Sequence, residues 1–285
     1  MTRSFGRIVA VVAVAAALSG CSQLGGLPQA APPREVRSGL DLLRAGRDAE
    51  AMAQFDAAVR KRPSDLRVYA TIAQEAGSRL GRWQIAAAYA KRGLKAAPEA
   101  AAPERAALHG ILGQARQEMG DFEGSVREHK AALKLLPDNP GLMNNLGYVY
   151  AEMPGGEAHL RDALHLTTEA VRIGRQQDVS DTELGVYMDS LGWVQYRLGR
   201  YDDALSSLAF AASMAPGEPD IQYHLAMAYR AKGDIASART MLLRTLRANP
   251  RHAPALAALA ALPASPPKRG GAASEPQQGP ALGAD

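Results

Sequence analysis

Cysteine is almost missing from this chain of 285 residues, which carries one, Cys21. Because a disulfide needs two cysteines, no disulfide within the chain can support its fold. Aromatic residues are also sparse, at 5% of the sequence. A β-sandwich or barrel needs runs of aromatic and β-branched residues, so this composition argues against both. The apolar 47% is rich in alanine instead, which favours the close packing of helices.

An excess of charge of one sign is lacking as well. The formal net charge is +4. If Arg3 and Arg7 are set aside with the signal peptide expected below, 31 basic residues face 29 acidic ones. No stripe of lysine and arginine indicates a nucleic-acid partner.

Motifs that carry catalysis are missing too. The sequence has no Gly-x-Ser-x-Gly elbow, no Walker A loop, no glycine-rich dinucleotide fingerprint and no His-Glu-x-x-His pair. The histidines fit ordinary surface or core positions: His109, His129, His159, His165, His224 and His252. We therefore predict no enzyme activity, no cofactor, no metal site and no small-molecule substrate. An enzyme whose site the sequence does not reveal, or a domain that serves an enzyme in trans, is the alternative.

The amino terminus has the pattern of an export signal. Arg3 and Arg7 precede an apolar run, residues 8–18, that is too short to span a bilayer. Leu18-Ser19-Gly20-Cys21 then resembles the lipobox of bacterial lipoproteins. That resemblance implies a signal peptide at 1–20, lipidation of Cys21 and a flexible tether over 21–33. With Ser22 rather than aspartate after the cysteine, it implies the inner leaflet of the outer membrane, facing the periplasm. An ordinary secretory signal, giving a non-lipidated periplasmic adaptor, is the alternative.

Residues 181–216 contain two amphipathic helices separated by a tight turn. Ala204, Leu208 and Ala211 follow helical spacing in the second helix. Gly199 is suited to the turn because glycine adopts a positive φ without strain, and Pro216 stops the second helix. Together with Leu191-Gly192, this spacing resembles the tetratricopeptide repeat, a helix-turn-helix unit of about 34 residues.

Similar spacing recurs along most of the chain. We expect repeats at 34–64, 65–98, 104–137, 138–175, 182–216 and 218–250, a capping helix at 252–262 and a disordered tail at 263–285. The turn of the fourth repeat, Met153 to Leu160, is longer than the others. The resemblance implies an all-α fold, a right-handed α–α superhelix known as a tetratricopeptide-repeat (TPR) solenoid.

A concave groove lined by the first helix of each repeat is what the resemblance implies for partner binding. The residues expected there are Asn144, Tyr148, Asp189, Trp193, Tyr196, Arg197, Tyr223, Met227 and Arg230. Tryptophan, tyrosine, methionine and arginine are enriched at protein interfaces. Packing of Trp193 and Tyr223 between repeats, as core residues, is the alternative. Only Asn145 fits the Lys/Asn pattern of carboxylate-clamp relatives, so the resemblance does not extend to a carboxylate-terminated partner.

These inferences lead to one functional hypothesis. The chain is expected to be a membrane-anchored scaffold or adaptor that holds an extended peptide or helix of a protein partner in its groove. By resemblance to TPR lipoproteins, it would help to assemble an envelope machine, with a pilus or secretion system as the first choice. Regulation of cell-wall synthesis and insertion of outer-membrane proteins are the alternatives.

Overall fold

The computed structural model describes residues 31–154 and 156–263. Every regular element in these ranges is helical. The helices are α2 (Arg34–Arg44), α3 (Asp48–Lys61), α4 (Leu66–Gln74), the π-helical turn η2 (Glu75–Arg79), α5 (Trp83–Ala96), α6 (Ala102–Glu118), α7 (Phe122–Leu135), α8 (Pro140–Glu152), α9 (Glu157–Gln176), α10 (Asp181–Arg197), α11 (Tyr201–Met214), α12 (Pro219–Ala231), α13 (Ile235–Ala248) and α14 (Ala253–Ala260). The predicted signal peptide, Cys21, most of the predicted tether and the tail from residue 264 lie outside the described residues.

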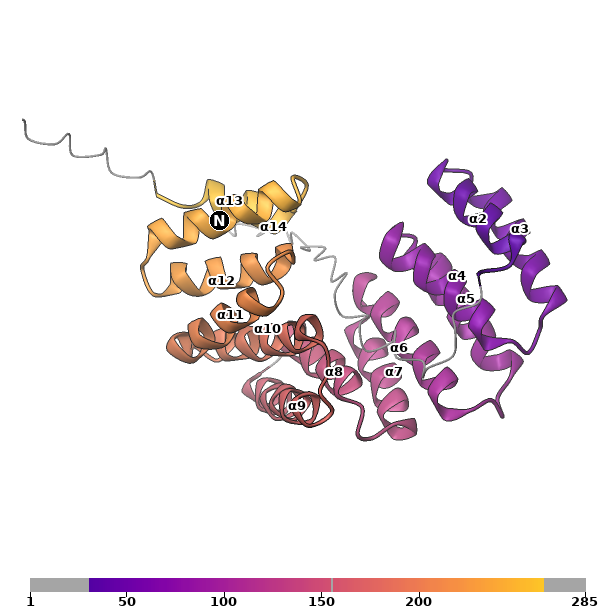
Figure 1. The fold of residues 1–285 in the computed structure, drawn as a ribbon, viewed down its shortest axis with the longest axis horizontal. Helices are drawn as coiled ribbons and strands as arrows, with labels where there is room; N and C mark the ends of the chain where they lie inside the picture. Colours follow the sequence, from indigo (N-terminus) through magenta and orange to yellow (C-terminus); the bar gives the residue numbers. More distant parts are fainter. Residues whose placement is uncertain (1–30, 155, 264–285) are drawn as a thin grey trace, which may run out of the picture.

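Successive helices form pairs, and the pairs stack in an arc. Contacts join α2 to α3, α4 to α5, α6 to α7, α8 to α9, α10 to α11 and α12 to α13, and α14 packs against α13. Figure 1 shows the arc, with α2 and α3 at one end and α13 and α14 at the other. The predicted fold class, an all-α superhelix of about six helix pairs closed by a final helix, is confirmed.

Most of the pairs share one kind of turn. A glycine with positive φ, between 66° and 82°, follows the first helix in five of them: Gly46, Gly81, Gly120, Gly199 and Gly233. Glycine adopts this conformation without the steric cost that a side chain would bring. The turn between α8 and α9 uses Pro154 and Gly156 instead, and no glycine of positive φ is described there. The fourth pair therefore departs from its neighbours where its sequence does.

Small residues let the two helices of a pair approach closely. A Cβ added to Gly192 on α10 would lie 2.6 Å from Cγ of Leu208 on α11. A Cβ added to Gly113 on α6 would lie 2.7 Å from Nε2 of His129 on α7. Both distances are too short for a side chain, so these glycines allow the pair to reach native packing density.

The core is spread along the stack rather than gathered at one centre. One cluster of buried apolar residues runs from Val36 to Ala115, and another runs from Leu146 to Leu262. Smaller clusters lie between helices of the middle and later pairs. Helices contact mainly their sequence neighbours and the adjacent pair, as expected for a repeat array. No helix in the described part of the chain is both long and apolar enough to cross a membrane.

Candidate partner-binding surface

The first helices of the later pairs turn one side toward the inside of the arc. The negative charge of Asp220, at the start of α12, acts on the carboxyl group of Glu118, at the end of α6. These helices belong to pairs that are three places apart in the stack. Contacts also run directly between the first helices, from α6 to α8, from α8 to α10 and from α10 to α12. We call this side of α6, α8, α10 and α12 the inner face.

The structure places the nine predicted groove residues at different depths. Five are buried, namely Asn144, Tyr148, Asp189, Trp193 and Met227. Tyr196 and Tyr223 are partly buried, and Arg197 and Arg230 are exposed. Tyr148, Trp193 and Met227 belong to one apolar cluster with residues of α9, α13 and α14. This burial favours the core alternative for Trp193, whereas partner contact by any of the nine stays a prediction.

Trp193 is fixed from both sides and at its polar edge. Its ring stacks on Tyr196, with centroids 4.9 Å apart, and on His224, with centroids 4.2 Å apart. Its Nε1 donates a hydrogen bond of 2.7 Å to Oε1 of Glu152. The guanidinium of Arg197 lies 3.2 Å from the same oxygen. Three successive first helices, α8, α10 and α12, are thereby joined through one indole.

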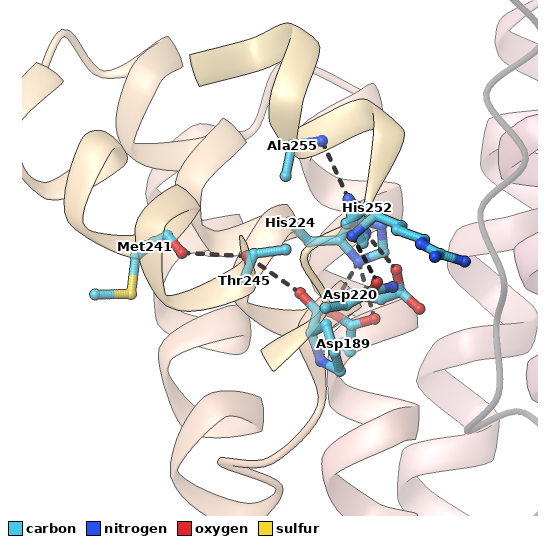
Figure 2. Close-up of polar contacts among 10 residues, drawn as sticks. Asp189, Asp220, His224, Met241, Thr245, His252 and Ala255 are labelled. Atoms are coloured by element: carbon cyan, nitrogen blue, oxygen red, sulfur yellow. Dashed lines mark hydrogen bonds and ion pairs between the residues drawn. The ribbon is translucent and has the colours of Figure 1, made fainter. Parts of the chain in front are cut away.

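Two histidine–aspartate pairs also connect neighbouring units (Figure 2). Nδ1 of His224 lies 2.9 Å from Oδ2 of Asp189, and Nε2 of His252 lies 2.8 Å from Oδ1 of Asp220. Nδ1 of His252 accepts the backbone N–H of Ala255 at 3.1 Å, which caps α14. Because that nitrogen accepts, Nε2 is the one that donates to Asp220.

In the buried pair between α10 and α12, the carboxylate changes the protonation of the histidine. Burial alone disfavours the charged imidazole of His224. The negative charge of Asp189, its hydrogen bond and the charges of Asp220 and Glu152 together outweigh burial, so the pKa of His224 is raised. Sequence interpretation treated His224 and His252 as ordinary surface or core residues. Their carboxylate partners were not foreseen, since they lie more than thirty residues away.

Four carboxylates act on the hydroxyl of Tyr148. Burial and then the charges of Glu152, Asp220, Asp189 and Glu118 raise the pKa of Tyr148 well above its usual range. Burial, with a smaller effect of Asp220, raises the pKa of Glu118 to about 7. Sequence analysis did not select Glu118. The available signal was its position five residues after Leu112-Gly113, which matches Arg197 after Leu191-Gly192.

Comparison with known proteins gives matches to repeat proteins. A family model described as tetratricopeptide repeat matches residues 196–262. Intraflagellar transport protein 70A of Bos taurus is 29% identical over 122 residues, which are 43% of this chain and 18% of that protein. Intraflagellar transport protein 70B of Bos taurus is 32% identical over 95 residues, which are 33% of this chain and 14% of that protein. The match thus spans less than a fifth of either relative.

Solved structures match over more of the chain. The Cut9–Hcn1 hetero-tetramer of the APC/C has a TM-score of 0.62 at 16% identity and covers 80% of this chain and 42% of that one. TTC0263, a thermophilic TPR protein of Thermus thermophilus, has a TM-score of 0.57 at 21% identity and covers 68% of this chain and 97% of that one. A tetratricopeptide repeat protein of Parabacteroides merdae has a TM-score of 0.53 at 15% identity and covers 75% of this chain and 78% of that one.

These identities show the fold alone, and none of the matches indicates a catalytic family. The helix pairs, the turn glycines and the structural matches agree with one another. The chain therefore has the fold of a tetratricopeptide-repeat solenoid, and residues 196–262 match the sequence pattern of that repeat family.

Proposed function

We propose that this chain is a membrane-anchored scaffold that binds a protein partner on its inner face. The fold is consistent with protein–protein interaction. The observation that carries the proposal is the set of accessible side chains above a fixed base. Tyr196, Arg197, Tyr223 and Arg230 retain exposure on α10 and α12 while Trp193 is held beneath them. Tyrosine and arginine side chains are among those that contribute most to binding at protein interfaces, and a rigid base limits the entropy lost by the backbone when a partner binds.

Anchoring is proposed from the sequence. Cys21 and the segment before it lie outside the described residues, and the proposal depends on their resemblance to a lipobox. Several acyl chains on Cys21 would attach the chain stably to a membrane, where a single chain binds only weakly. The outer membrane, on its periplasmic side, is the proposed location. A secreted adaptor without lipid is the alternative.

Assembly of an envelope machine is the proposed role, with a pilus or secretion system first. Regulation of cell-wall synthesis and insertion of outer-membrane proteins are alternatives with the same plan of anchor, tether and repeats. The partner is proposed to be an extended peptide or a helix of another envelope protein, and not nucleic acid.

Crosslinking in native envelopes tests the binding surface. A photoreactive amino acid would replace Arg197 or Arg230 on the inner face, and Ser206, which is exposed on α11, in the control. We expect one partner to be captured from the first two positions and not from Ser206. Equal capture from all three positions, or capture from Ser206 alone, would contradict the assignment of the inner face.

Fatty-acid labelling tests the anchor. A radioactive fatty acid should label the wild-type chain and not Cys21→Ser. Equal labelling of both proteins would rule out lipidation at Cys21.

A further inference from the structure

An acceptor without a donor lies on the inner face of α8. Asn144 is 2% exposed, and its Oδ1 has no hydrogen-bond partner. A buried polar atom left in this state costs free energy, so such atoms usually have a partner. Asn144, Tyr148 and Glu152 follow one another at intervals of four residues, which places them on the same side of the helix. The free acceptor therefore faces the region around Tyr148.

Negative charge converges on that region from four first helices. Glu118, Glu152, Asp189 and Asp220 all act on the hydroxyl of Tyr148. Three of these carboxylates have partners in the chain, which are Arg197, His224 and His252. Glu118 has no hydrogen-bond or ion-pair partner among the described residues, and the negative charge of Asp220 acts on it unfavourably. Glu118 is therefore the one carboxylate of these four that has no positively charged partner among the described residues.

The unpaired acceptors indicate the chemistry of the group that would bind them. Carboxylates and an amide oxygen are all hydrogen-bond acceptors, so their common partner is a donor with positive charge. In the described residues no group of three or more histidine, aspartate or glutamate side chains is placed to hold a metal ion. A larger cation that presents several N–H groups fits better. The aromatic ring of Tyr148 suits the same guest, because a cation is attracted to a ring face.

We propose that the inner face around Tyr148 binds a lysine or arginine side chain of the protein partner, with Glu118 and Asn144 as its unpaired acceptors. This inference depends on the proposed function, since it names the chemistry of the partner segment that the scaffold holds. It also gives a role to a carboxylate whose surroundings oppose its charge. Burial and, to a smaller extent, the charge of Asp220 disfavour the ionised carboxylate of Glu118 in the free chain, and a bound cation would offset that cost.

Short blocked peptides provide the test. They carry one central arginine, lysine, citrulline or glutamate among serine, alanine and glycine. Purified full-length chain in detergent is titrated with each, and the fluorescence of Trp193 is followed in a Trp83→Phe background. We expect the arginine and lysine peptides to bind at least about tenfold more tightly than citrulline, which keeps the shape of arginine without its charge.

A matched pair of variants separates binding from folding. Glu118→Gln should weaken the arginine peptide about tenfold without lowering the melting temperature, because the change removes a charge that its surroundings disfavour and breaks no hydrogen bond or ion pair among the described residues. Glu99→Gln makes the same change of charge at an exposed loop position and should alter neither quantity. Equal affinity for arginine and citrulline, preference for glutamate, or no binding of any peptide would overturn the proposal. So would full affinity in Glu118→Gln.

Two further outcomes identify what has failed. If Glu118→Gln captures the crosslinked partner as well as the wild-type chain does, the cation site is wrong while the scaffold function stands. If putrescine binds as tightly as the arginine peptide, the site takes a small free cation and the assignment to a partner side chain is overturned.

Discussion

His129 should make the chain lose stability in mild acid. It lies on α7 against Gly113 of α6, is fully buried, and its Nδ1 has no hydrogen-bond partner. Burial lowers the pKa of His129 from 6.5 to about 4, and the nearby charge of Glu128 offsets only part of this effect. The imidazole is thus neutral in the folded chain at a pH where it is already protonated in the unfolded chain.

The sign and size of this change in the free energy of unfolding follow from the difference in the number of protons that the folded and unfolded chains bind. Above pH 6.5 both states are neutral at this site, and there is no penalty. Between pH 6.5 and about 4 the unfolded chain binds the extra proton, so the free energy of unfolding falls as the pH falls. The separation between the two pKa values corresponds to a loss on the order of 3 kcal/mol.

Urea unfolding followed by circular dichroism at fixed pH values would measure this loss. His129→Gln removes the titrating group, so the difference in free energy between wild type and variant should change by about 3 kcal/mol from pH 7.5 to pH 4. His165→Gln, at an exposed position on α9, controls for the loss of any histidine. If wild type and His129→Gln show parallel pH profiles, the burial of this imidazole does not have the effect described.

Three more perturbations test other contacts. Gly192→Ala should lower stability by about 1–2 kcal/mol in thermal melts, because overpacking against Leu208 costs more than the gain in helix propensity. Gly217→Ala is the control and should stay near wild type, because no atom lies near its Cβ position. Trp193→Ala should cost about 3 kcal/mol, because the buried ring is lost; a melting curve like that of wild type would show that the ring is not core. Asp189→Asn should cost more at pH 5 than at pH 8. Asp189 raises the pKa of His224, and stability from a raised histidine pKa is present below the unfolded value and lost as the pH rises through the folded one, so an equal loss at both pH values would contradict the pairing.

The repeat plan could be predicted because each pair repeats its local signals. Gly199 must reverse the chain and Pro216 must end a helix wherever they occur in a pair, and these requirements depend only on neighbouring residues. The unusual fourth turn was visible for the same reason. The π-helical turn after α4 was not predicted. There Gly77 lies against the ring of Trp83, and this contact is made between two helices.

How deeply each side chain of the inner face is buried was harder to predict. Helical spacing places Trp193 and Arg197 on one side of α10, but it does not say how far the next pair covers them. His224 of α12 stacks on the indole of Trp193, whereas Arg197 remains exposed. The approach of Glu118 to Asp220 depends on the curvature of the whole stack. Curvature is the sum of small rotations between pairs, and no short stretch of sequence specifies it.

An arc built from separate clusters has a mechanical consequence. Because each pair is held mainly by its neighbours, a slight change of angle at every junction can alter the span between α2 and α14 while no cluster comes apart. An array of this kind can deform elastically, so its ends can move apart when a large partner binds and return when the partner leaves. The tension that it bears would be shared among all the junctions, so no single hinge has to give way.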